Sequence, residues 1–139
     1  MWLYNGKPFT SEDIKDYVGF VYLITNLNSS RKYIGKKGFY KVKAYQKNKK
    51  RRRKKVESDW QDYFGSCQAL VEDVKKQGEG DFRREIIRLC KSKGEMNYFE
   101  LEEQVLNKVL WNDDFYNDYI GTRVHRKHIA HVERLLSDS

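Results

Sequence analysis

The sequence predicts a small α/β protein in which helices flank one three-stranded antiparallel sheet, with the element order β-β-α-β-α-α. Two segments of β-branched and aromatic residues, separated by a short turn, predict a pair of strands. Three later segments repeat apolar residues at helical spacing, and a further strand-like segment lies between the first two of them. Because a sheet has to bury its apolar face, we expect the helices to pack on it.

The first two strands are expected to form a hairpin. Residues 19–25 (GFVYLIT) are rich in β-branched and aromatic side chains, and residues 32–35 (KYIG) follow after a gap. The turn-forming residues 26–30 (NLNSS) separate the two segments. A loop this short favours antiparallel pairing.

The first predicted helix covers residues 66–77. Ser66 is a suitable N-cap and Gly78 supplies a C-terminal stop. The apolar residues follow the i, i+3, i+4, i+7 pattern of a buried helix face, and they are Cys67, Leu70, Val71 and Val74. On this face Cys67 is expected to be a small core residue rather than a nucleophile.

A third strand and two more helices complete the order. Residues 82–90 predict a short strand, residues 97–110 a helix with a broad apolar arc, and residues 126–136 a last helix with an apolar stripe. The arc consists of Tyr98, Phe99, Leu101, Val105, Leu106, Val109 and Leu110. The stripe consists of Ile129, Val132, Leu135 and Leu136, which serve equally well as core or as a dimer contact.

The 139 residues are expected to form one domain. Its parts are a lead-in (residues 1–18), a core (19–120) with a basic insert (41–57), and a C-terminal helix (121–139). The lead-in contains an Asn5-Gly6 turn and a cap at Thr10 or Ser11.

Composition excludes several classes of protein. The two cysteines, Cys67 and Cys90, form neither a disulfide framework nor a thiolate metal site. No apolar run approaches the roughly 20 residues that a membrane span needs, and the N-terminus lacks a signal-peptide pattern. We therefore expect a cytoplasmic protein without a membrane partner.

Positive charge is concentrated in one segment. Residues 31–55 hold fourteen Lys and Arg and no Asp or Glu, so with a net charge of +8 for the whole chain the remaining residues carry −6. The densest part is an unbroken run of seven cations, Lys49, Lys50, Arg51, Arg52, Arg53, Lys54 and Lys55. Such a run repels itself, so we expect a loop that does not fold independently.

The partner that best suits this run is a nucleic acid, because each cation that displaces a counterion from phosphate adds affinity. A solvated loop and a localisation-type tract are the alternative interpretations. Since phosphate contacts carry no direct base information, binding through the run should be similar for all sequences.

Several segments carry a family resemblance. Phe20-Val21-Tyr22 and Tyr33-Ile34-Gly35 resemble the two signature tripeptides of the GIY-YIG nuclease superfamily. Residues 33–37, 60–66, 82–86 and 90–100 further resemble its phage-encoded, Seg-like branch of homing endonucleases. The resemblance extends from about Gly19 to about Asn117 and implies the small GIY-YIG fold.

The resemblance implies hydrolysis of phosphodiester bonds in DNA with help from one divalent cation, Mg²⁺ or Mn²⁺, in the cytoplasm of an infected host. It assigns proton transfer from water to Tyr22, orientation of the site to Tyr33, and the metal to Glu100. An ordinary tyrosine loses its proton near pH 10, so a base would need cationic neighbours, and Lys36 and Lys37 follow Tyr33 closely. A hard cation commonly uses only one or two protein carboxylates.

The sequence departs from the family pattern at two places. Phe20 stands where the signature begins with Gly, and residues 66–77 lack the arginine that the family places on this helix. We expect Lys36, Lys37, Arg83 or Arg84 to supply the missing positive charge, since any preorganised cation can stabilise charge on phosphate. Arg83 and Arg84 are also expected to contact DNA.

The choice of metal ligand has an alternative. A helical wheel that begins at Tyr98 places Glu102 inside the apolar arc and Glu100 roughly opposite, whereas the motif favours Glu100. We follow the motif, and Glu103 remains a third option.

Each of these residues also has a purely structural interpretation. Tyr22 and Tyr33 are explained equally as sheet aromatics, and Gly35 and Gly65 as turn residues with positive φ. Tyr63-Phe64 is either core or a platform for stacking on bases, and core is favoured. Asn117 suits a cap or turn better than a place in the site. His125, His128 and His131 recur every three residues, which favours a surface helix face over a zinc site.

Two other functions remain open. A catalytically inactive DNA-binding accessory protein on the same fold is favoured by the missing helix arginine, and an RNA-binding protein by the charge alone. In a chain of this size, sequence specificity is either low or supplied by a partner or by dimerisation.

Overall fold

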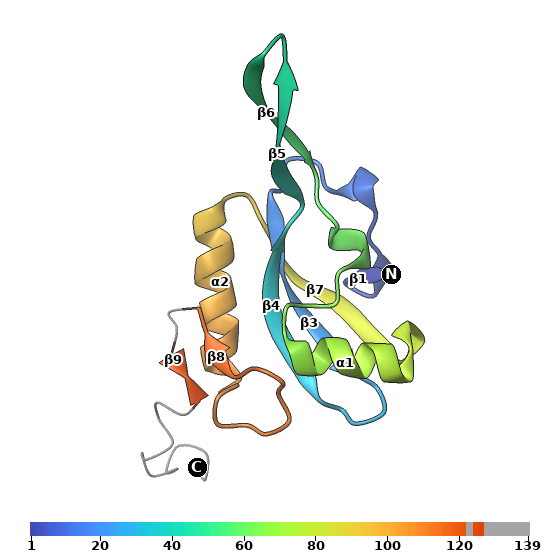
Figure 1. Cartoon of the computed structure of the whole chain (residues 1–139). Helices are drawn as coiled ribbons and strands as arrows, with labels where there is room; N and C mark the ends of the chain where they lie inside the picture. Colours follow the sequence, from blue (N-terminus) through green and yellow to red (C-terminus); the bar gives the residue numbers. More distant parts are fainter. Residues whose placement is uncertain (122–123, 127–139) are drawn as a thin grey trace.

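A five-stranded mixed sheet forms the centre of the protein (Figure 1). The computed structural model describes residues 1–121 and 124–126. The strand order is β2-β1-β7-β3-β4, where β1 is Trp2–Tyr4, β2 Lys7–Pro8, β3 Gly19–Asn26, β4 Lys32–Gly38 and β7 Phe82–Cys90. β3 pairs antiparallel with both β4 and β7, whereas β1 pairs parallel with β7. β4 is therefore an edge strand of this sheet.

Two helices cover the opposite faces of the sheet. α1 (Gln68–Gln77) packs on the face that carries Phe20, Tyr22 and Ile24, and α2 (Lys93–Leu106) on the face that carries Val21 and Ile34. Successive side chains of a strand point to opposite faces, so each face has its own apolar cluster. The smaller elements are the 3-10 helices Ser11–Asp13, Trp60–Asp62 and Glu79–Asp81 and the strands β8 (Tyr119–Ile120) and β9 (Val124–His125).

The sequence predicted the centre of this sheet but not its size. The three predicted strands are β3, β4 and β7, and residues 82–90 are confirmed as a strand. The prediction of three purely antiparallel strands is wrong, because residues of the lead-in add β1 and β2. β1 has only three residues, and its partner Arg84–Ile86 lies far along the chain, so no local pattern marks it. The Asn5-Gly6 turn between β1 and β2 is confirmed by positive φ at both residues.

Both described helices begin at different residues from those predicted. α1 begins at Gln68 with Cys67 at the N-cap, because the Ser66 hydroxyl pairs with the Tyr33 hydroxyl. α2 begins at Lys93 rather than at residue 97, because Ser92 caps it by accepting a hydrogen bond from the Glu95 amide at 3.1 Å. This earlier start brings Met96, one of the buried residues, into α2.

The basic insert is a β-hairpin, not a loop. β5 (Tyr40–Lys47) and β6 (Lys50–Glu57) pair along their whole length and project from one end of the molecule (Figure 1). Asn48 and Lys49 at the turn have φ of 53° and 61°, as the two central residues of a type I′ turn require. The sequence prediction missed this turn because Asn-Lys lacks the glycine that usually marks it.

Among the described residues, no helix is long and apolar enough to cross a membrane. The predicted helix over 126–136 lies, except for Arg126, outside the described residues, and so does the dimer contact that it would provide.

Candidate active site

Tyr22 and Gly35 face each other across β3 and β4. They are direct partners in the antiparallel register, and the Tyr22 side chain is 1% exposed. A Cβ atom at position 35 would lie 2.5 Å from the Tyr22 hydroxyl oxygen, so the phenol occupies the space that any other side chain would fill. Gly35 is thus required by this close approach and not by positive φ, whereas Gly65 does have a positive φ of 89°.

Tyr33 and Tyr63 complete a cluster of three tyrosines around Tyr22. The ring of each lies 6.1 Å from the Tyr22 ring, and the Tyr63 ring stands at 85° to it. The Tyr33 hydroxyl lies 3.3 Å from the Ser66 hydroxyl, which precedes the N-terminus of α1. Residues 60–66 therefore contact a tyrosine from each of the two signature tripeptides. The sequence indicated core or a stacking platform for Tyr63, and the structure places it beside Tyr22.

Both signature tyrosines are neutral phenols in this environment. Burial raises the pKa of Tyr22 well above its usual value, and Tyr33, Tyr63 and the Glu100 carboxylate raise it further. Burial also raises the pKa of Tyr33 to about 12, although its hydrogen bond with Ser66 acts in the opposite direction. Neither Lys36 nor Lys37 is among the causes of these shifts, and their help to a tyrosine base stays a prediction.

Glu100 lies on the sheet-facing side of α2. Its side chain is 13% exposed, and its Oε1 lies 3.6 Å from the Lys36 Nζ. The Lys36 ammonium also donates a hydrogen bond to the Asn97 side-chain oxygen. Burial raises the pKa of Glu100, and Lys36 opposes this shift. Lys36, Asn97, Glu100 and Gly121 line the same open hollow.

The helical wheel chose the wrong face because it left out Met96 and took Tyr98, Val105 and Leu106 as buried, whereas all three are exposed. Met96 and Gln104 are the buried residues of α2, and Glu100 lies one turn from each of them. Tyr98 is 61% exposed, so the predicted apolar arc points largely into solvent. The described structure places Glu100 toward Lys36, and its role as a metal ligand stays a prediction.

Lys36 and Lys37 lie on opposite faces of β4. Lys37 shares the face of the tyrosines, where its Nζ lies 4.1 Å from the centre of the Tyr63 ring and 2.7 Å from an Asp59 carboxylate oxygen. That carboxylate side chain is 69% exposed. Ion pairs with such exposed partners are weak, so Lys37 remains available to a phosphate.

Arg83 and Arg84 have different environments. Arg84 is 5% exposed and donates hydrogen bonds to the carbonyl oxygens of Gln61 and Tyr63 at 2.9 and 2.8 Å. Its guanidinium group lies over the rings of Trp2 and Phe64. Arg84 therefore supports the segment that carries Tyr63. Arg83 is exposed and pairs with Glu85 at 2.9 Å.

Asn117 fixes the outer edge of β4. Its side chain accepts a hydrogen bond from the Ile34 amide and donates one to the Ile34 carbonyl, at 3.1 and 2.9 Å. Gln104 donates a second hydrogen bond to the same carbonyl. The middle residue of the second tripeptide is thus held by two amide side chains, one of which, Gln104, the sequence pattern did not single out.

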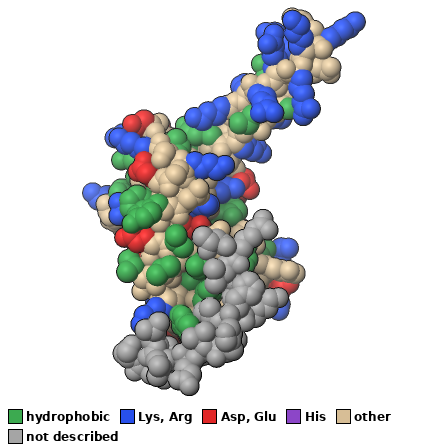
Figure 2. Space-filling view, turned by 90° about the vertical axis from the view of Figure 1, so that its left-hand side faces the viewer, with side chains coloured by type: hydrophobic (Ala, Val, Ile, Leu, Met, Phe, Trp, Pro, Cys, Tyr) green, Lys and Arg blue, Asp and Glu red, His purple; other side chains and the backbone are tan. Residues whose placement is uncertain are grey.

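The seven-cation run lies away from the tyrosines, on β6 and the hairpin turn. Figure 2 shows Lys and Arg side chains gathered on this projection, whose residues 41–55 are all exposed. The structure therefore divides the predicted site residues into the tyrosine cluster, the Lys36–Glu100 pair and the hairpin.

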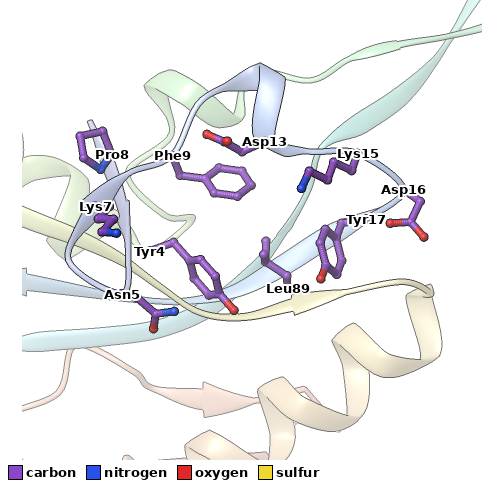
Figure 3. A pocket seen from close by; sticks show the side chains of 10 residues that line it. All are labelled: Tyr4, Asn5, Lys7, Pro8, Phe9, Asp13, Lys15, Asp16, Tyr17 and Leu89. Atoms are coloured by element: carbon purple, nitrogen blue, oxygen red, sulfur yellow. The ribbon is translucent and has the colours of Figure 1, made fainter.

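Other features lie outside this arrangement. A hollow between the first strands and β7 is lined by Tyr4, Phe9, Tyr17 and Leu89 with charged residues around them, and it contains none of the predicted site residues (Figure 3). Cys67 is half-buried and packs against the core beneath α1. His128 and His131 lie outside the described residues.

Within the part of the chain that the structure describes, no three His, Cys, Asp or Glu side chains form a group that could hold a metal. Mg²⁺ often binds through only one or two protein carboxylates, because it usually retains several water ligands and binds phosphate oxygens.

Comparisons with known proteins agree with the fold. A family model described as "Putative endonuclease segE, GIY-YIG domain" matches residues 2–120. The chain is 31% identical over 99 residues to a protein of Enterobacteria phage T4 named "Putative endonuclease segE". The matched region is 70% of this chain but only 39% of that relative, so the chain spans well under half of its length. No solved structure matches.

Proposed function

The chain belongs to the family of GIY-YIG domains described for putative endonuclease segE, and from this premise we propose that it is a divalent-metal-dependent DNA endonuclease of the phage homing type. The observation that supports this function best is the contact between Tyr22 and Tyr33 across Gly35. Glu100 lies near enough to add to the rise in the pKa of Tyr22. Tyr22 thus interacts with each of the other two residues that the family resemblance selects, Tyr33 and Glu100.

The residues beside Glu100 suit a divalent cation. A carboxylate oxygen of Glu100 and the amide oxygen of Asn97 both contact the Lys36 ammonium, so a positive charge already stands between two oxygen donors. We assign Mg²⁺ or Mn²⁺ to this place, with Glu100 as its protein carboxylate. A bound divalent cation supplies charge neutralisation at phosphate and activates water.

Glu100 and Asn97 would hold such a cation in the place that the Lys36 ammonium now occupies. Lys36 lies on the face of β4 opposite the tyrosines, whereas the Tyr22 hydroxyl rests over Gly35. Because burial keeps Tyr22 protonated, its hydroxyl has to release its own proton to solvent before it can act as a base, and positive charge nearby would favour this release. We assign this charge in part to Lys37, which lies on the tyrosine face of β4, and the resulting phenolate would then take the proton of the attacking water.

Lys37 is the best replacement for the missing helix arginine. It lies on the tyrosine face of β4, and its partner Asp59 is exposed, so a phosphate can displace that carboxylate. Arg84 is unsuitable because it is buried and donates to two carbonyl oxygens. As a point charge, Lys37 would neutralise phosphate without the two-pronged contact of an arginine.

The hairpin and Arg83 are assigned to the DNA backbone. The run from Lys49 to Lys55 is exposed and has no acidic residue within it, so each cation can displace a counterion from phosphate. Affinity for duplex DNA should therefore fall steeply as salt rises.

One alternative function has a specific observation in its favour. α1 has no arginine, and both signature tyrosines are protonated in the protein without substrate. A catalytically inactive binding protein on the same fold would show these features as well.

Incubation with supercoiled plasmid separates the two functions. We expect nicked or linear product with Mg²⁺ or Mn²⁺, none with EDTA, and none with the Glu100→Gln variant. Glu102→Gln is the matched control, since it removes a carboxylate two residues away on the same helix, and it should remain active. Plasmid that stays intact but is retarded on the gel would contradict catalysis and favour the binding protein. Loss of activity in Glu102→Gln alone would overturn the choice of Glu100.

A further inference from the structure

The pairing of β5 with β6 sorts the cations of the hairpin onto two faces. Residues directly opposite each other in an antiparallel pair share a face, and successive residues alternate between faces. Lys43 pairs with Lys54, and Gln46 with Arg51. One face, the cation face, carries Lys41, Lys43, Tyr45, Lys47, Lys50, Arg52, Lys54 and Val56. The other, the mixed face, carries Tyr40, Val42, Ala44, Gln46, Arg51, Arg53, Lys55 and Glu57.

The cation face places like charges directly opposite each other. Lys43 faces Lys54, and Lys47 faces Lys50. Such pairs destabilise a hairpin. The stretch from residue 41 to residue 55 contains no carboxylate and is exposed throughout, so neutralisation has to come from a separate polyanion.

The mixed face has a different chemistry. Around Arg51 and Arg53 it carries Gln46, Ala44 and Val42. Arginine pairs with guanine O6 and N7, glutamine with adenine N6 and N7, and small apolar groups contact the thymine methyl group. These are the residue types that distinguish base pairs in the major groove.

The dimensions of the hairpin fit the same groove. The major groove of B-form DNA, about 12 Å wide, admits a two-stranded ribbon, whereas the major groove of RNA duplexes is too narrow for side chains to read. Eight residues of strand extend about 27 Å at the usual rise, which corresponds to about eight base pairs.

We propose that the β5–β6 hairpin enters the major groove of duplex DNA and reads base edges with Arg51, Arg53 and Gln46. The long side chains of the cation face contact the phosphates of the groove walls. This inference rests on the proposed function in taking duplex DNA as the partner. It goes beyond that function because it makes the hairpin a source of sequence specificity.

The test selects preferred sequences from a pool of randomised DNA duplexes by binding alone, with the full chain in EDTA so that no cleavage occurs. We expect the selected duplexes to share a short sequence motif. This motif should lie beside the stretch of DNA that the body of the protein covers. The variant Arg51→Lys with Arg53→Lys keeps every charge but removes the two-pronged contacts. It should lose at least about tenfold in affinity for the selected sequence, with an unchanged salt dependence.

Arg52→Lys is the matched control, because Arg52 lies between the two changed residues but on the cation face. Since a phosphate contact needs only the charge, which lysine keeps, this variant should select the same motif and lose less affinity than the double variant. Methylation of guanine N7 in the selected sequence should weaken binding, since this atom lies in the major groove.

Several results would overturn the inference without touching the proposed function. These are steeply salt-dependent binding with no enriched motif, an equal loss in Arg52→Lys, or equal affinity for duplex RNA. Each can occur while plasmid nicking proceeds normally. Absence of any binding to duplex DNA would instead overturn both proposals.

Discussion

The body of the protein and its hairpin are built by different forces. In the body, strands and helices bury Trp2, Trp60 and Tyr22 to 1% exposure, and side-chain packing fixes the position of Tyr22. In the hairpin, every side chain from 41 to 55 is exposed, and the backbone ladder with its turn fixes the shape. The body thus positions the side chains of the candidate active site, and the hairpin exposes positive charges on its surface.

This difference makes the two regions separable by mutation. Substitutions in the tyrosine cluster should change chemistry or stability and leave affinity for DNA intact. Substitutions on the hairpin should change affinity and leave the body folded.

The largest expected effect tests the chemistry of the body. Tyr22→Phe keeps the packing over Gly35 but removes the hydroxyl, and we expect a loss of about 10²- to 10⁴-fold in the rate of plasmid nicking. Tyr33→Phe should also abolish detectable nicking. Gel retardation should show unchanged DNA affinity for both variants. Normal nicking by Tyr22→Phe would remove this residue from the mechanism.

The second effect tests the charge of the hairpin. Replacement of all seven cations from Lys49 to Lys55 by Ser should lower duplex affinity on the order of 10³-fold, and the slope of log affinity against log salt should fall by about 0.9 for each lost phosphate contact. Thermal unfolding of the body should not change. Lys75→Ser with Lys76→Ser is a control on exposed positions of α1. An unchanged slope in the hairpin variant would place the run away from DNA.

The third effect compares two neighbouring arginines of β7. Arg84→Met leaves two carbonyl oxygens without their donor, so we expect a loss of about 2–4 kcal/mol in the free energy of unfolding. Arg83→Met, on the exposed side, should cost less than about 0.5 kcal/mol. Urea unfolding of both variants measures the difference. Equal losses would mean that the buried hydrogen bonds of Arg84 contribute little.

The smallest effect concerns pH. The pKa of Tyr33 is about 12 in the folded protein, whereas the unfolded chain releases this proton near pH 10. The stability that the neutral phenol contributes is therefore complete below pH 10 and is lost as pH rises through about 12. Relative to Tyr33→Phe, the wild-type protein should lose about 1 kcal/mol between pH 9 and pH 11. Parallel unfolding curves of the two proteins over this range would contradict the buried position of Tyr33.

The sequence predicted those parts of the fold that local patterns encode. β-Branched runs marked β3, β4 and β7, and the two signature tripeptides placed Tyr22 and Tyr33 as partners. β1 escaped prediction because its stability comes from a parallel partner distant in sequence. The hairpin escaped because charge repulsion argued against a fold that backbone pairing and a type I′ turn nevertheless form.

The site was predicted less completely than the fold. The motif pointed to Glu100 although the helical wheel pointed to Glu102, because the wheel left out Met96, which the cap at Ser92 brings into α2. Gln104 gave no signal, and Tyr63 gave only a choice between core and a stacking platform, because their places depend on how separate segments meet. Arg84 was assigned to DNA because of its positive charge. The charge alone does not indicate that this side chain is buried and donates hydrogen bonds to two carbonyl oxygens.

The amide contacts at Ile34 also bear on self-association. An edge strand such as β4 presents free amide and carbonyl groups on which a second molecule could add a strand and begin aggregation. Here Asn117 and Gln104 occupy both groups of Ile34, and the backbone of Asp114 and Tyr116 pairs with Lys32. These hydrogen bonds block the addition of a strand from another copy of the chain along the first half of β4, from Lys32 to Ile34.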